Sequence, residues 1–141
     1  MRLFNSLTNL ASLKDMSRNT MVEHLGITFT AIGDDYIEAT MPVDHRTHQP
    51  LGMLHGGASL ALAETLGSVA GHSCLDNTKQ YCVGIEINAN HIKSVREGIV
   101  TGRTTPIHIG KRTQVWEIRI TNEQKELVCI SRITLAVIDK R

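Results

Sequence analysis

Residues 56–74 read GGASLALAETLGSVAGHSC, and this stretch decides the fold. It is rich in alanine, leucine, glycine and serine, and it is nearly apolar on every side. A helix that lacks a polar face is buried on most sides rather than lying on the protein surface. We therefore predict a long buried helix from Gly56 to about Cys74 at the centre of the molecule.

Strand-like segments flank this helix in the sequence. Upstream, alternating apolar residues on both sides of the turn at 33–35 indicate a β-hairpin over 27–32 and 36–43. Downstream, β-branched residues and period-two alternation predict four more strands, over about 81–91, 98–109, 112–121 and 126–138. Two short helices are expected before the hairpin, over 6–17 and from Asn19 or Thr20 to His24. The order predicts an α+β fold, a single domain over 1–141 in which antiparallel strands wrap round the helix.

Composition and charge exclude several classes of protein. The formal net charge is +1 with histidine neutral, so no overall field favours nucleic acid or an anionic membrane. No segment has the apolar length of a membrane span, and the first residues do not resemble a signal peptide. Cys74, Cys82 and Cys129 are odd in number and widely spaced, as in a reduced protein. We expect a cytoplasmic protein without nucleic-acid or membrane partners.

Glu64 is the most informative residue, because it is the only charged residue between His55 and His72 in the predicted buried helix. Desolvation raises the pKa of a carboxyl group and costs stability unless hydrogen bonds offset it. A sequence that accepts this cost can be using the carboxylate for chemistry. Glu64 could equally face a narrow solvent stripe or pair with an arginine from a strand, so this residue alone leaves both interpretations open.

The start of the helix favours chemistry. Gly56 and Gly57 have no Cβ, so a substrate carbonyl can approach the free N–H groups of the first helical turn. Those groups carry partial positive charge and suit a developing oxyanion. Glu64 follows Gly56 by eight residues, roughly 12 Å along a helix axis, so one substrate carbonyl cannot contact both groups of the same helix. If both act, two antiparallel helices from two subunits must share each active site, which predicts a two-fold dimer.

Three polar residues near the helix are further candidates. Gln49, in the loop before the helix, could form a hydrogen bond to the substrate carbonyl oxygen or to an attacking water, or it could simply order the loop. His55 could hold that loop or polarise the carbonyl. Ser68 lies one turn beyond Glu64 and could orient its carboxylate, although a small residue for close helix packing is an equally ordinary role.

Other site types are disfavoured. The Asp44, His45 and His48 grouping on an irregular loop is weak evidence for a metal, and we expect none. No G-x-S-x-G motif for a serine hydrolase and no glycine-rich phosphate loop occurs. A local basic cluster does follow two of the strands and could bind the phosphates of a nucleotide-bearing thiol, or be ordinary solvated charge: His91, Lys93, Arg96, Lys111 and Arg112.

Three runs of sequence resemble the glutamate-dependent hot-dog-fold thioesterases. They are MPVDHRTHQPLGMLHGGASLALAETLGSVAG (41–71), VGIEINANHIKSVREG (83–98) and PIHIGKRTQVWEI (106–118). Within this family the chain is most similar to the 1,4-dihydroxy-2-naphthoyl-CoA hydrolases of menaquinone synthesis, with the enterobactin-pathway proofreading and 4-hydroxybenzoyl-CoA thioesterases as relatives. The resemblance implies a six-stranded antiparallel sheet wrapped round a long central helix, homodimers paired into a homotetramer, and no metal or cofactor.

The resemblance also implies roles for particular residues. Glu64 would be the nucleophile or general base, Gln49, His55 and the Gly56 N–H would assist it, and Ser68 would support it. Contacts with substrate and CoA would come from Gly84, His91, Ile92, Lys93, Ser94, His108, Ile109, Gly110, Lys111, Arg112 and Thr113.

The sequence thus predicts an acyl-CoA thioesterase that acts on an aromatic acyl group such as naphthoyl or benzoyl. One alternative is a proofreading or housekeeping thioesterase for acyl-carrier-protein or fatty acyl-CoA substrates. An alternative of another class is a non-catalytic acyl-CoA-binding module, which would need the pocket and the basic cluster but not Glu64. A hot-dog dehydratase is disfavoured, because its Asp-x4-His motif is absent: the residue five after Asp44 is Gln49.

Overall fold

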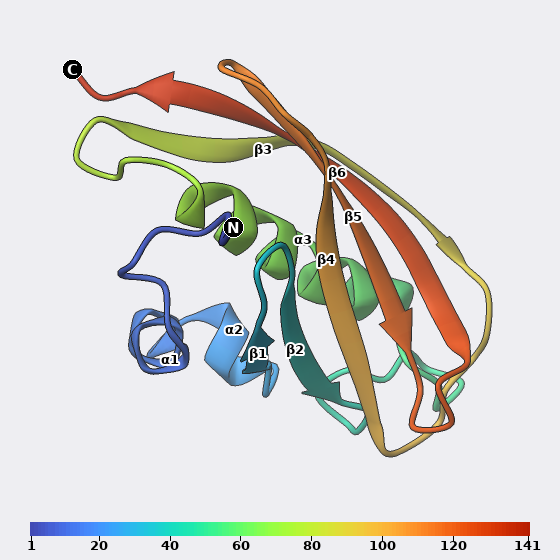
Figure 1. The fold of residues 1–141 in the computed structure, drawn as a ribbon. Coiled ribbons are helices and arrows are strands. Elements are labelled where there is room, and N and C mark those ends of the chain that lie inside the picture. Colours follow the sequence, from blue (N-terminus) through green and yellow to red (C-terminus); the bar gives the residue numbers. More distant parts are fainter.

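The computed structural model describes the whole chain, Met1–Arg141. Figure 1 shows a strongly curved sheet that holds one long helix in its hollow, with two short helices beside its first strand. The elements in chain order are α1 (Leu10–Ser17), α2 (Met21–His24), β1 (Thr28–Ile32), β2 (Ile37–Pro42), α3 (Gly56–Ser73), β3 (Gln80–His91), β4 (Ile99–Ile109), β5 (Thr113–Thr121) and β6 (Leu127–Asp139).

The six strands form one antiparallel sheet in the order β1-β2-β4-β5-β6-β3. This confirms the predicted α+β architecture, and it is the hot-dog fold that the resemblance implies. Each predicted strand and the central helix agree with the observed bounds to within one residue at each end. The first helix is shorter than predicted: it begins at Leu10 rather than at residue 6, because the side chain of Asn9 caps it by accepting from the Ser12 N–H at 2.9 Å.

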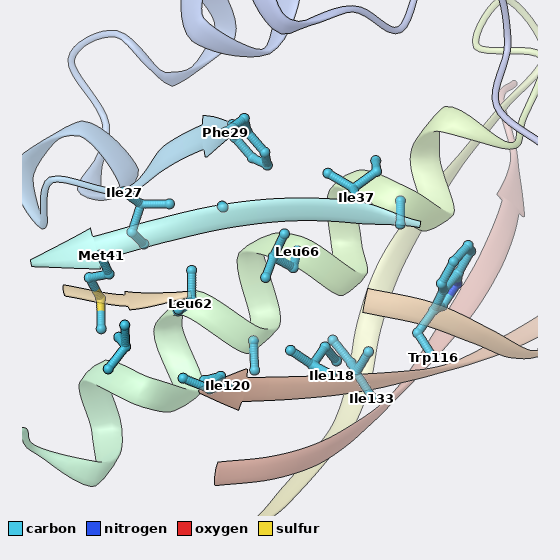
Figure 2. Close-up of a cluster of buried hydrophobic side chains, with 14 of the residues drawn as sticks. Ile27, Phe29, Ile37, Met41, Leu62, Leu66, Trp116, Ile118, Ile120 and Ile133 are labelled. Atoms are coloured by element: carbon cyan, nitrogen blue, oxygen red, sulfur yellow. The ribbon is translucent and has the colours of Figure 1, made fainter. Parts of the chain in front are cut away.

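The core lies between α3 and the concave face of the sheet. Leu62 and Leu66 project from the helix toward the inner face of the sheet, and both are fully buried (Figure 2). The inward positions of the strands alternate with outward polar ones, as the period of a strand requires. Glycine makes close packing possible at Gly102, where a Cβ would stand 2.6 Å from Leu66 Cδ1. The fully buried side chains on the sheet include Ile37, Met41, Val100, Trp116, Ile118, Ile120, Ile133 and Leu135.

Two features are left without partners in the single chain. Strand β3 pairs only with β6, so its other edge is free along its whole length, and Val83 and Ile85 on it are exposed. One stripe of α3 is not covered by the sheet either, and it comprises Gly57, Leu60, Ala61, Glu64, Thr65, Ser68 and His72. No helix combines the length and apolar character that crossing a membrane would require.

Candidate active site

Glu64 lies in the middle of α3, on the stripe that the sheet leaves half-covered. Its carboxylate lies against Gly84 of β3, and Oε2 is buried without any hydrogen-bond partner in the chain. Desolvation by burial raises the pKa of this carboxyl group above its ordinary value. No arginine pairs with it, so the buried-ion-pair interpretation is wrong within the single chain. A carboxylate with an unused oxygen is available to accept a proton or to attack an electrophile.

The predicted supporting role of Ser68 has no direct contact behind it in the single chain. The Ser68 hydroxyl lies one turn beyond Glu64, on the same half-covered stripe, but it makes no hydrogen bond to the carboxylate. The backbone carbonyl of Ser68 instead accepts from the Cys82 thiol, at 3.8 Å. Ser68 is therefore near enough in sequence to support the carboxylate, but its hydroxyl is not bonded to it.

The N-terminus of α3 forms a second group of candidate residues. His55 is the N-cap, and its Nδ1 accepts the Gly57 N–H at 2.7 Å, so His55 holds the helix start in place. The Gly56 N–H, by contrast, has no partner within the chain. Of the two glycine N–H groups predicted to be free, only that of Gly56 is therefore available to an oxyanion.

A pocket of about 330 Å³ is lined by Gly56 at the start of α3. Gln49 lies on its wall, and its side-chain oxygen accepts from the Leu51 N–H, which leaves the amide NH2 free to donate into the pocket. His91, at the end of β3, lies against Gly56. The other lining residues are Met53, Leu54, Ser59, Ile92, Lys93, Ser94 and Val128. The structure therefore brings Gln49, Gly56 and the 91–94 segment together in one pocket.

The loop that carries Gln49 is tied to the segment after β3. The Leu54 N–H donates to Val95 O at 2.8 Å, and His48 Nε2 lies 2.8 Å from Arg96 O. His48 thus makes a structural contact that sequence reasoning missed, because its partner lies 48 residues away. His45 does not share this contact, and its Nδ1 lies 4.0 Å from Asp44 Oδ1. Asp44, His45 and His48 therefore do not converge on one metal-binding point.

The candidate CoA-binding segments lie at opposite ends of the sheet. His91 pairs with Cys129 on β6, whereas Thr113 pairs with Ala136 on the same strand. Seven residues of strand separate those positions, which corresponds to roughly 23 Å. The 91–94 segment therefore accompanies Gly56, while the 108–113 segment lies at the β4–β5 turn, at the other end of the sheet (Figure 1).

Charge differs between these two segments. Lys93 is already paired, with its Nζ 2.6 Å from Glu126 Oε2. Lys111 and Arg112 are exposed and make no ion pair, so their charges are free for a phosphate. Arg96 is likewise exposed and without an ion pair, and it donates to Leu51 O at 3.4 Å.

Other features of the chain do not form part of this site. A cavity of about 620 Å³ lies between α1, α2 and β1, and neither Glu64 nor Gly56 lines it. The three cysteines are free thiols, and burial raises the pKa of Cys74 to about 12 and of Cys82 to about 11. Protonated thiols are poor nucleophiles, so none of the three cysteines is suited to act as a catalytic nucleophile.

Comparisons with known proteins find related sequences and structures. The family model described as the thioesterase superfamily matches residues 51–129. The 1,4-dihydroxy-2-naphthoyl-CoA hydrolase of Escherichia coli is 54% identical over 92% of this chain and 94% of its own length. The proofreading thioesterase EntH of Cronobacter sakazakii is 54% identical over 92% of this chain and 93% of its own. A crystal structure of a thioesterase from Haemophilus influenzae superposes with a TM-score of 0.94 at 53% identity, covering 97% of this chain and 95% of that one.

Proposed function

Since this chain belongs to the thioesterase superfamily and is a thioester hydrolase, we propose that it hydrolyses an aromatic acyl-CoA to the free acid and CoA. Glu64 is the catalytic carboxylate of this proposal, and the observation that carries it is the buried Glu64 Oε2 without a partner. The similarity to the Escherichia coli hydrolase favours a 1,4-dihydroxy-2-naphthoyl or benzoyl group, and with it a cytoplasmic role in menaquinone synthesis.

The proposed active site is shared between two chains. Gly56 and Glu64 lie about 12 Å apart along one helix, so a single thioester cannot reach both in the same subunit. The free edge of β3 and the half-covered stripe of α3 offer a continuous surface for a second copy. Pairing across a two-fold axis would set the two α3 helices antiparallel, with Gly56 of one chain beside Glu64 of the other. Two such dimers would pair into the homotetramer.

In this arrangement the Gly56 N–H and the Gln49 amide polarise the thioester carbonyl, and His55 holds the helix start in place. Glu64 of the other chain then acts in one of two ways. As a base, it takes a proton from water while the hydroxide attacks the carbonyl carbon and the C–S bond breaks, releasing the CoA thiolate. As a nucleophile, it forms a mixed anhydride with loss of the thiolate, and water then cleaves the anhydride. Ser68 supports the carboxylate in either route.

The same pairing would join the two CoA-binding segments. The 91–94 segment lies beside Gly56 in each chain, while the 108–113 segment lies at the far end of the sheet. An antiparallel partner brings the far end of one sheet toward the near end of the other. The CoA phosphates would then lie near the unpaired charges of Lys111 and Arg112, with Lys93 contributed by the partner subunit.

A panel of acyl-CoA substrates tests the proposal. Purified protein is incubated with naphthoyl-, benzoyl- and fatty acyl-CoA, and CoA release is followed with a thiol reagent. We expect kcat/KM to be highest for the aromatic substrates, and Glu64→Gln, which keeps the shape and removes the charge, to abolish nearly all turnover. Near-normal kcat of Glu64→Gln on every substrate would overturn the role of Glu64, and a preference for fatty acyl groups would overturn the aromatic assignment.

A further inference from the structure

Gly84 lies against the carboxylate of Glu64. A Cβ built on Gly84 would stand 2.7 Å from Glu64 Oε1 and 3.5 Å from both Cδ and Oε2. The first distance is well below van der Waals contact, so the carboxylate occupies the space that any other residue would fill with its side chain. This contact differs from the role implied by the resemblance, in which Gly84 touches the substrate.

The backbone at Gly84 gives no other reason for glycine. The glycines with left-handed φ are Gly26, Gly52 and Gly98, and Gly84 is not among them. An L-residue would therefore adopt the Gly84 backbone conformation without strain. Glycine in the interior of a strand weakens the strand, so its presence here needs a reason in what approaches it.

The local sheet structure also indicates a close approach at Gly84. The pairing of β3 with β6 shifts register between Gly84 and Glu86, which leaves Ile85 as an extra residue. A β-bulge of this kind bends the strand and re-aims the side chains around it, and bulges are frequent beside active sites. The bulge and the absent Cβ therefore occur at the same point, directly opposite the one carboxylate of α3.

We propose that Gly84 is a positioning residue: its missing Cβ sets where the Glu64 carboxylate lies between α3 and β3. The inference rests on the proposed catalytic role of Glu64. An alanine at 84 would be accommodated by the fold, because the atom it meets is the far end of a flexible side chain. The cost would fall on the carboxylate, which must move by several tenths of an ångström. Displacements of that size at a reacting group reduce turnover strongly.

A double-mutant cycle tests this steric role. Gly84→Ala is expected to lower kcat by about 10- to 100-fold with KM little changed, since the carboxylate and not the binding surface has moved. Glu64→Asp is one methylene shorter and withdraws the carboxylate from position 84. In that background Gly84→Ala should lower kcat further by only about threefold or less. Thr134→Ala, on β6 opposite Glu86 and beside the bulge, is the control for a general disturbance of the β3–β6 pairing.

A second readout does not depend on turnover. The carboxyl carbon of Glu64 is titrated by NMR in the wild type and in Gly84→Ala, and the proposal requires a change in its titration that the control Thr134→Ala does not produce. Additive effects of Gly84→Ala and Glu64→Asp, or a raised KM with unchanged kcat, would overturn the proposal in favour of a substrate contact. A wild-type protein that hydrolyses no acyl-CoA would refute the proposed function, whereas the NMR comparison would still decide the position of the carboxylate.

Discussion

The imidazole Nε2 of His91 lies 2.8 Å from the position that a Cβ on Gly56 would occupy. The last residue of β3 thus closes over the first residue of α3, at the point where the helix presents its one unpaired glycine N–H. Glycine at 56 allows this approach and leaves the N–H open to the pocket. The contact places the 91–94 segment, proposed to bind CoA, and the Gly56 N–H, the proposed oxyanion donor, on one wall of the pocket.

The role of the Gly56 N–H can be separated from the role of its missing Cβ. Proline is tolerated at the first position of a helix, and His55 already has the extended backbone (φ −68°, ψ 131°) that precedes a proline. Gly56→Pro and Gly56→Ala both add a Cβ, but only proline removes the N–H. We expect kcat for Gly56→Pro to fall about 100-fold or more below that of Gly56→Ala, measured on the best acyl-CoA substrate. Equal kcat for the two variants would exclude the N–H as an oxyanion donor.

Mixing two inactive variants tests whether the active site is shared. Glu64→Gln and Gly56→Pro each leave intact the half-site that the other lacks. After unfolding and refolding together at equal concentration, random pairing makes half of the dimers mixed, and each mixed dimer has one complete site. Activity should therefore recover to about one quarter of the wild type. Samples refolded separately are the control, and a mixture no more active than these would show that each site lies within one chain.

Ionisation of Glu64 with rising pH should increase the activity of the protein and decrease its stability. Desolvation raises the pKa of its carboxyl group, so the acidic limb of kcat/KM should lie above the ordinary titration range of glutamate, with activity rising as the group ionises. A raised pKa in the folded state means that ionisation costs stability, and the cost is fully present above that pKa. Glu64→Gln should therefore raise Tm at pH 8 and have little effect below the unfolded-state pKa. Thermal unfolding at several pH values measures this, and a lower Tm for Glu64→Gln at pH 8 would contradict it.

The cysteine thiols should be nearly unreactive in the folded protein. Burial raises the pKa of Cys74 to about 12 and of Cys82 to about 11, and it also raises that of Cys129, so few thiolates exist at neutral pH. Reaction with an aromatic disulfide reagent at pH 8 should be slow in the native state and fast for all three thiols in guanidinium. A rapid native phase would show that one of these thiols is exposed and ionised.

A buried hydrogen bond between Trp116 and Gln114 should contribute measurably to stability. Trp116 Nε1–H donates to Gln114 Oε1 at 2.9 Å, and both side chains are fully buried. Trp116→Phe leaves that oxygen unsatisfied and should lower the free energy of unfolding by about 1–3 kcal/mol, beyond any loss of packing. Urea denaturation measures the change. Adding Gln114→Leu removes the orphaned oxygen and should restore part of the loss; a further drop of similar size would argue against this account.

The sequence by itself determined the elements of this protein and their order. The apolar helix with its single acid and the strands with alternating side chains are both local patterns. Each follows the period of its own secondary structure, so each can be recognised in the sequence alone. Because the rise per residue of a helix is fixed, the eight-residue spacing also shows that a site using both Gly56 and Glu64 needs a second chain. Only the start of the first helix was predicted wrongly. The apolar residues upstream of Asn9 fit a helical pattern as well, but the Asn9 cap begins the helix at Leu10.

Only the tertiary structure decided what touches what. His55 captures the Gly57 N–H, so one glycine and not two is open to an oxyanion. The Gly84–Glu64 approach arises from a β-bulge and from strand register, neither of which one sequence reveals. The same holds for the separation of the 91–94 and 108–113 segments. Such contacts join residues far apart in the chain, and their geometry follows from packing the whole sheet round the helix rather than from any local preference.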